Sequence, residues 1–360
     1  MLLPDTKDWD GQPGLRGLLT AGSPSELRRR RMECQSILLE QLHTLPIEVW
    51  MQRVNRMHDA VQGRAVELCE MQMEEAGHGP PPCAYSFVVF GSAGRQEATL
   101  WSDQDNGLIM EGPESEELSR YFENFGFRLS RLLAEVGYEK CPGKVMCSEP
   151  MWRKTLPEWK RQLEEWRARF EWEAVRYLII ASDLRHIAGD RALTEAWLDH
   201  FHEGFRDNER LQVAVLRNTV RHKATLNLLG QVMTERFGDH AGGFDVKYGL
   251  YIPLVNSVRH VSLSRGIRAT STLQRLELLA EGGEEAWTGR VKEAFLTALG
   301  MRAKTAYTVQ EGMLSGSDYA SEEALQDKRL LSELRDSLLL VRRIHRALQR
   351  QLRSAERRQL

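Results

Sequence analysis

Helical periodicity dominates both ends of the chain. Apolar side chains recur every three, four or seven residues between positions 47 and 68, which is the spacing of an amphipathic helix. An earlier helix is predicted to begin at residues 23–26, where a serine cap, a proline and a capping-box glutamate occur together. The Gly- and Pro-rich stretch 77–82 ends the second helix and marks a domain boundary. Residues 1–22, rich in Gly, Pro and Asp, are expected to be poorly ordered.

The middle of the chain has a different pattern. The apolar run Phe87–Phe90 predicts a buried strand, and Asn106–Met110 predicts a second one. A helix is predicted over Glu114–Val136, because apolar residues form a stripe there and a glycine follows. Tyr138–Met146 is a candidate for a further strand. From Pro157 onwards the apolar spacing is almost wholly helical.

These elements together predict an α+β fold. A small mixed-sheet domain is expected at residues 81–195. It is flanked by an all-α helical region at residues 1–80 and by an all-α helical domain at residues 196–360. A chain of 360 residues is long enough for such an arrangement of two or three modules.

Charge and cysteine content indicate which classes of protein the chain does not resemble. The chain has 49 Lys or Arg and 51 Asp or Glu, a formal net charge of −2, which makes nucleic acid an unlikely main partner. Two arginine-rich runs, at residues 28–31 and 342–350, are interpreted as solvated helix faces. The chain shows no apolar run of membrane-spanning length and no signal-peptide pattern. Five cysteines without a CxxC pair indicate free thiols, so a cytoplasmic protein is expected.

A glycine-serine turn after the first predicted strand has the character of a phosphate-binding site. Gly91 and Gly94 have no Cβ, so backbone N–H groups can approach phosphate oxygens closely. Ser92 adds a hydroxyl donor, and the Arg95 guanidinium offers a planar fork to phosphate. The turn is therefore a candidate nucleotide-binding segment.

Two carboxylates follow the turn. Side chains alternate along extended backbone, so Asp103 and Asp105 would point to the same side. Paired carboxylates beside a phosphate cradle suit Mg²⁺, with Mn²⁺ as the alternative ion. A solvated turn would explain the two aspartates equally well if they stood alone. However, the motifs occur in a specific order: a strand, Gly-Ser, Arg, Asp-x-Asp and a second strand. This order predicts transfer of a nucleotidyl group from a nucleoside triphosphate.

The segment GSAGRQEATLWSDQDNGLIM resembles the polymerase-β-type nucleotidyltransferase superfamily. It is most similar to bacterial nucleotidyltransferases related to the PII-protein uridylyltransferase. Four later blocks extend the resemblance: residues 141–146, 183–185, 244–247 and 271–276. The resemblance implies transfer of UMP or AMP from UTP or ATP to an acceptor protein or small molecule, as in signal transduction. It also implies that the C-terminal helical domain binds substrate.

Enzymes of this superfamily usually add a third acidic residue, and two positions compete for that role. Asp183 follows an apolar run and lies in a block that matches the family, so it is the preferred candidate. Glu149 is the alternative, and Asp183 could instead form an ordinary ion pair or helix cap. Lys144 and Lys247 are candidates for contact with phosphate or acceptor, although each could also be an ordinary surface lysine.

Two functions from different classes are compatible with these residues. The first is a metal-dependent nucleotidyltransferase. The second is a regulatory module that keeps the fold and binds nucleotide with little or no turnover. Ser92, Arg95 and the two aspartates favour the enzyme, whereas the lack of a third acid near the metals would favour the regulatory module.

Overall fold

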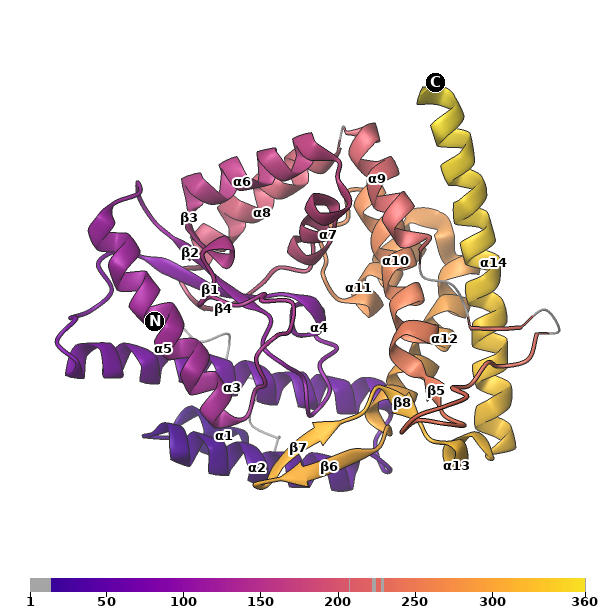
Figure 1. Ribbon diagram of the computed structural model, residues 1–360, viewed down its shortest axis with the longest axis horizontal. Coiled ribbons are helices and arrows are strands. Elements are labelled where there is room, and N and C mark those ends of the chain that lie inside the picture. The colour runs from indigo at the N-terminus through magenta and orange to yellow at the C-terminus, as the bar shows by residue number, and fades with distance from the viewer. Residues whose placement is uncertain (1–13, 207, 222–224, 228–229, 360) are drawn as a thin grey trace. The chain divides into compact units, whose positions relative to one another are not determined.

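The computed structural model describes residues 14–206, 208–221, 225–227 and 230–359 (Figure 1). The chain divides into two compact units. The first unit comprises Met1–Glu165, Ile180–Phe201 and Glu311–Met313, and the second comprises Trp166–Ile179, His202–Gln310 and Leu314–Leu360. The first unit contains a small mixed sheet with helices, and the second is mainly helical. The predicted α+β class is therefore confirmed.

Three helices open the first unit: α1 (Leu15–Leu19), α2 (Pro24–Gln41) and α3 (Ile47–Glu75). The predicted cap of α2 is present, since the Ser23 hydroxyl accepts a hydrogen bond from the Glu26 backbone N–H at 3.2 Å. The expectation of poor order through residue 22 was wrong for α1, because its buried leucines pack in the core. Residues 1–13 lie outside the described residues.

The sheet of the first unit has four strands in the order β3-β2-β1-β4. They are β1 (Tyr85–Val89), β2 (Asn106–Met110), β3 (Arg153–Thr155) and β4 (Arg185–Gly189). Strand β1 pairs antiparallel with both β2 and β4, and β2 pairs parallel with β3. Every residue of β1 and β2 is buried. The two strands predicted from apolar runs are thus confirmed as the centre of the sheet.

Two expectations about strands were wrong. Residues 138–146 form no strand; their carbonyl groups instead accept single hydrogen bonds from the backbone near the site, as at Gln104 and Asn106. Strand β4 was not expected, because helical spacing was predicted from Pro157 onwards. Its pairing partner β1 lies about a hundred residues earlier, so no local pattern reveals the strand.

Helices cover the sheet of the first unit (Figure 1). Helix α5 (Glu116–Val136) begins after a Ser115 cap and ends at Gly137, whose φ of 105° is left-handed as predicted. Helices α2 and α3 both pack against α5. The N-terminal helices, predicted as a separate region up to residue 80, therefore lie in the same compact unit as the sheet.

Two short elements, α4 (Gly91–Gly94) and η2 (Pro150–Trp152), and most of the helices α6 (Leu156–Arg169) and α8 (Arg191–Arg206) also belong to the first unit, whereas most of α7 (Trp172–Ala181) belongs to the second. Aromatic packing joins α6 and α8 to the core of the first unit. The fully buried Trp159 contacts Trp152 and Trp197, with ring centroids 6.0 and 5.9 Å away. Its indole N–H donates to the Leu108 carbonyl at 2.9 Å. Trp159 is therefore a core residue, as predicted from helical spacing.

The second unit is a bundle of helices with short strand pairs. Its helical elements are α9 (Glu209–Thr219), η3 (Lys247–Tyr251), α10 (Ile252–Ser264), α11 (Thr272–Leu279), η4 (Ala280–Glu284), α12 (Glu285–Ala303), α13 (Glu322–Leu325) and α14 (Lys328–Gln359). Strands β5 (Phe244–Asp245) and β8 (Tyr319–Ala320) pair, as do β6 (Tyr307–Gln310) and β7 (Met313–Gly316). Helix α14 packs against α9, α10 and α12. Among the described residues, none of the helices combines the length and apolar character needed to cross a membrane.

Candidate functional site

The turn that leaves β1 lies against the second of the two aspartates. Gly91 begins α4 with a φ of +55°, a conformation that favours glycine. A Cβ built on Gly91 would collide with Oδ2 of Asp105. The Asp105 carbonyl also accepts a hydrogen bond from the Phe90 N–H at 2.9 Å. The structure therefore brings the glycine-serine turn and Asp105 together, as the sequence predicts.

The residue between the two aspartates anchors them. Gln104 is buried, and its side-chain amide donates to the carbonyls of Ser130 at 3.0 Å and Tyr138 at 3.1 Å. Asp103 and Asp105 on either side are only partly buried. Gln104 therefore holds this segment against the core, while the aspartates on either side keep some access to solvent.

A thiol lies beside the two carboxylates. Burial raises the pKa of Cys141 to about 12, with the negative charge of Asp105 as the second cause and a smaller contribution from Asp103. Asp105 also accepts a hydrogen bond from this thiol. This contact was not predicted, because a lone cysteine in a sequence has many ordinary explanations. It shows that Asp103 and Asp105 both lie near the turn that begins at Cys141.

Arg95 lies in a buried cluster of charges. Its side chain is 6% exposed, and Nε donates to Glu97 at 2.8 Å while Nη1 donates to Asp183 at 2.5 Å. The Asp183 side chain is 1% exposed. Gly94 completes the contact, because a Cβ there would overlap the Asp183 backbone carbonyl. Phosphate binding by Arg95 and a third-acid role for Asp183 stay predictions; the structure itself shows the two residues holding each other.

A second ion pair, between α3 and β4, also holds α4 in place. Arg185, at the start of β4, forms a two-pronged pair with Asp59 of α3, at 2.8 and 2.7 Å. Its Nη2 group also donates to the Ala93 carbonyl at 2.8 Å. The short helix α4 is thus tied to both α3 and β4. This clamp was not predicted, since Asp59 and Arg185 are 126 positions apart.

Helix α3 also holds the loop that leads to Asp103. The Asn55 side chain accepts from the Ala98 N–H at 3.1 Å. His58 is fully buried, with Nε2 2.8 Å from the Thr99 carbonyl and Nδ1 2.8 Å from the Tyr138 hydroxyl. Because a carbonyl can only accept, Nε2 bears the proton and Nδ1 accepts from Tyr138. Burial lowers the pKa of His58 to about 3, so the ring is neutral.

The remaining predicted residues lie in different surroundings. Lys144 is exposed and has a φ of 56°; its N–H closes a turn onto the Cys141 carbonyl at 3.0 Å. Glu149 is partly buried at the start of η2, and its negative charge acts on Arg153. Lys247 belongs to the second unit, where its ammonium pairs with Asp318 at 3.0 Å. The turn that carries Lys144 begins at Cys141, the neighbour of Asp105, and roles of Lys144 and Lys247 in binding phosphate or acceptor stay predictions.

The described residues contain no group of three or more His, Cys, Asp or Glu side chains arranged to hold a metal ion. The acidic groups of the site instead divide into two sets. Asp103 and Asp105 are partly exposed, whereas Asp183 and Glu97 are buried around Arg95. Asp103 and Asp105 are therefore the candidate cation ligands of the site.

Comparison with known proteins yields two family matches. The model described as "Putative nucleotidyltransferase DUF294" matches residues 35–172, which include Gly91, Ser92 and both aspartates. The model described as "Putative nucleotidyltransferase substrate binding domain" matches residues 209–352. Asp183 falls between the two matches. A search of curated proteins found no match. The two matches together cover most of the chain, which therefore belongs to a nucleotidyltransferase family in which a nucleotidyltransferase domain precedes a substrate-binding domain.

Proposed function

We propose that the first unit transfers UMP or AMP from a Mg²⁺-bound nucleoside triphosphate, UTP or ATP, to an acceptor protein or small molecule, as a signal-transduction enzyme. The observation that supports this most directly is the packing of the Asp105 carboxylate on Gly91. It joins a candidate phosphate cradle to a candidate cation ligand within one site.

The two partly exposed aspartates fit the chemistry of Mg²⁺. This ion is usually bound through one or two carboxylates together with substrate phosphates, rather than by a cage made only of protein groups. Asp103 and Asp105 would hold it, and when bound it would neutralise charge on the phosphates of the donor. Mn²⁺ is the alternative ion, because it prefers the same oxygen ligands.

The turn would bind the triphosphate. The intrahelical hydrogen bonds of α4 begin with those donated by Gly94 to Phe90 and by Arg95 to Gly91. The N–H groups of Ser92 and Ala93 come before these donors in the chain, and the first N–H groups of a helix have no partner within the helix. The partly exposed Ser92 side chain adds a hydroxyl donor. In the transfer an acceptor oxygen would attack the α-phosphorus, and the bond to pyrophosphate would break.

The buried charges would orient the turn. Arg95 is held by Glu97 and Asp183, and through its position in the chain it fixes the end of α4. These contacts support a positioning role for Arg95 and Asp183 in place of direct contact with substrate. Glu149 is then the remaining candidate for the third acid, and it is the more accessible of the two.

A regulatory module that binds nucleotide with little or no turnover is the second candidate function. Two observations favour it. The Asp183 carboxylate is already paired with Arg95, and the part of the chain that the structure describes shows no cluster of three metal-binding side chains. Without a third acid, the acceptor would lack a group to take its proton.

Label transfer from α-³²P-labelled UTP and ATP, with Mg²⁺ or Mn²⁺ and a cell lysate as the source of acceptor, tests the enzyme proposal. Wild type should transfer label, and the double variant Asp103→Asn, Asp105→Asn should not. The control is Glu116→Gln with Glu117→Gln, which removes two exposed carboxylates of α5 from the same unit. Label transfer by the aspartate variant would refute the assignment. Nucleotide binding by wild type without pyrophosphate release would favour the regulatory module.

A further inference from the structure

The two arginine-rich runs of the sequence differ in the structure. In α2 the positive charges are satisfied internally: Arg29 and Arg30 both pair with Glu33, at 2.6 and 3.2 Å. Arg31 is fully buried and donates to the Val136 carbonyl at 3.0 Å. The arginines of this run therefore have their partners within the first unit. The second run, on α14, differs in this respect.

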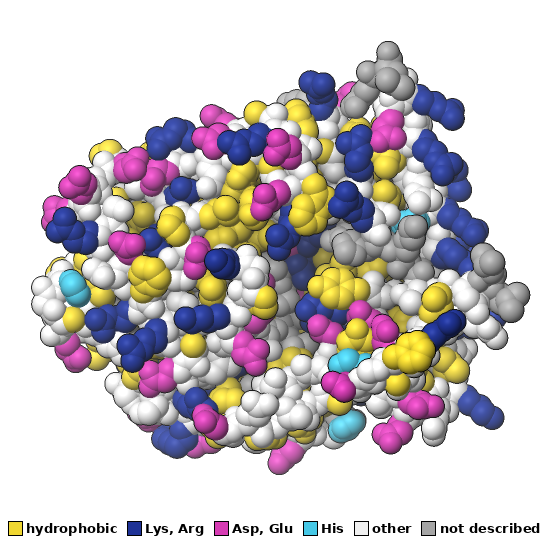
Figure 2. Space-filling model, in the orientation of Figure 1, with side chains coloured by type: hydrophobic (Ala, Val, Ile, Leu, Met, Phe, Trp, Pro, Cys, Tyr) yellow, Lys and Arg dark blue, Asp and Glu magenta, His cyan; other side chains and the backbone are white. Residues whose placement is uncertain are grey.

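Five arginines form what we call the arginine stripe of α14: Arg343, Arg346, Arg350, Arg353 and Arg357. All five side chains are exposed, and none forms an ion pair with a residue that the structure describes. At 3.6 residues per turn they fall within an arc of about 80° and extend over about 21 Å of helix. Figure 2 shows Lys and Arg side chains gathered along the edge that α14 forms in Figure 1.

The opposite side of α14 packs against other helices of the second unit. Leu334, Leu338, Val341 and Leu348 are buried, as predicted from their spacing. The helix therefore has no apolar face left for insertion into a membrane surface, which amphipathic membrane helices require. The stripe is the side of the helix that remains available to a partner.

Charge is strongly segregated in this chain. Helix α14 has ten Lys or Arg and three Asp or Glu, a formal charge of +7. Because the whole chain has −2, all other residues together have −9. The near-neutral total charge, which argues against nucleic acid as a partner of the whole chain, thus conceals a local cationic surface.

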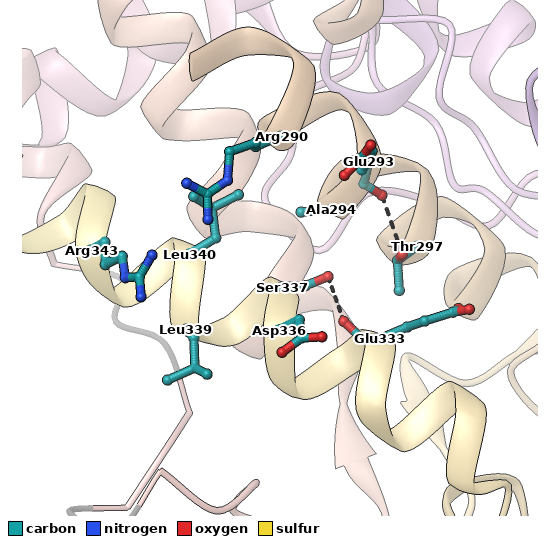
Figure 3. Close-up of a pocket in the computed structure, with 10 residues that line it drawn as sticks. All are labelled: Arg290, Glu293, Ala294, Thr297, Glu333, Asp336, Ser337, Leu339, Leu340 and Arg343. Carbon is teal, nitrogen blue, oxygen red and sulfur yellow. Dashed lines mark hydrogen bonds between the residues drawn. The ribbon is translucent and has the colours of Figure 1, made fainter. Parts of the chain in front are cut away.

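A groove between α12 and α14 borders the stripe. It has a volume of about 390 Å³, and Arg290 of α12 and Arg343 both line it. In Figure 3 the guanidinium groups of these two arginines lie at the end of the groove away from Glu333. Arg290 therefore adds one guanidinium beside Arg343, whereas Glu293, Glu333 and Asp336 line the rest of the groove.

We propose that the arginine stripe docks the phosphodiester backbone of duplex nucleic acid without reading its sequence. Regularly spaced guanidinium forks match a linear array of phosphates. Between Arg343 and Arg357 the arc contains no aromatic residue, so stacking on single-stranded bases is not supported. It also lacks the apolar centre that a protein interface requires. This inference goes beyond the proposed function and does not rest on it.

Fluorescence anisotropy with labelled RNA and DNA duplexes of about 16 base pairs tests the proposal, using the full chain without nucleotide at about 50 mM salt. Wild type should bind both duplexes irrespective of sequence, and log K should fall with log salt with a slope of roughly −4. Arg346→Glu with Arg350→Glu and Arg353→Glu should weaken binding about tenfold or more and flatten the slope by roughly 3. Circular dichroism melting should show this variant to be folded, because all three side chains are exposed.

The matched control changes the net charge equally but elsewhere. Arg16→Glu, Arg120→Glu and Arg131→Glu replace three exposed arginines of the first unit and should leave duplex binding as in wild type. Three results would overturn the proposal: no duplex binding by wild type, equal weakening by both triple variants, or displacement of the duplex by poly-glutamate at equal charge concentration. The last result would assign the stripe to an acidic protein. Because no nucleotide is present, these results are independent of transferase activity.

Discussion

Nη1 of Arg95 donates to Oδ2 of Asp183 at 2.5 Å, and the carboxylate is 1% exposed. Arg95 also donates to the buried Glu97 at 2.8 Å, so one buried guanidinium pairs with two buried carboxylates. Removing one partner from a buried ion pair leaves a charge that is not compensated, and this costs more than losing a surface pair. The pair therefore links the end of α4 to the segment before β4.

Asp183→Asn should destabilise the fold and slow transfer without changing its pH dependence. The amide keeps the shape of the side chain but loses its charge, and we expect the free energy of unfolding to fall by about 3 kcal/mol. Denaturant unfolding and the pH profile of label transfer measure the two effects. If Asp183 were the catalytic base, the acidic limb of the profile would disappear. Glu149→Gln is the matched comparison, and at this partly exposed site it should leave stability close to wild type.

Gly91→Ala should abolish nucleotide binding, while it destabilises the fold by only roughly 1–2 kcal/mol and leaves the chain folded. Gly91 has a φ of +55°, and an added methyl group would push the Asp105 carboxylate out of place. Gly112→Ala is the control, since Gly112 has a φ of +85° but no atom within 4 Å of the position of an added Cβ. Both variants pay a backbone cost of roughly 1–2 kcal/mol. Calorimetric titration with Mg²⁺–ATP and Mg²⁺–UTP should separate them, and equal affinities would contradict the role of the Gly91–Asp105 contact.

Sequence patterns within short segments predicted the two central strands of the sheet and the contact between the glycine-serine turn and Asp105. Apolar runs indicated β1 and β2, and the order of glycine, serine and aspartate placed Gly91 near Asp105, because these residues are close in sequence. The partners of Arg95 could not be predicted in this way. Asp183 is 88 positions away, and β4, which follows it, is a strand only because it pairs with β1.

The two arginine runs illustrate the same limit. Both read as solvated helix faces in the sequence, because exposure and pairing depend on residues elsewhere. Glu33 lies within one turn of Arg29 and Arg30, so the pairing in α2 is local. The burial of Arg31 against the Val136 carbonyl is not, since these residues are 105 positions apart.

Cys141 should react slowly with alkylating reagents, and Asp105→Asn should accelerate the reaction. Burial first, and the Asp105 carboxylate second, raise the pKa of this thiol to about 12, so little reactive thiolate is present at about pH 8. Removing the carboxylate charge removes the second cause. Cys83, which is also partly exposed but lies away from Asp105 in sequence, is the internal control. Mass spectrometry of iodoacetamide adducts over time measures both rates, and an unchanged Cys141 rate in the variant would argue against the contact.

His58 should make the fold sensitive to acid. Burial lowers its pKa from 6.5 to about 3 in the folded chain, so between these values only the unfolded chain takes up a proton. The stabilising effect of the neutral ring is therefore complete above about pH 6.5 and is lost as the pH falls toward 3, at about 1.4 kcal/mol per pH unit. His58→Gln should remove this slope, whereas the exposed His43→Gln should retain it. Denaturant unfolding across this pH range measures the difference, and parallel curves for wild type and the His58 variant would contradict a buried neutral imidazole beneath the site.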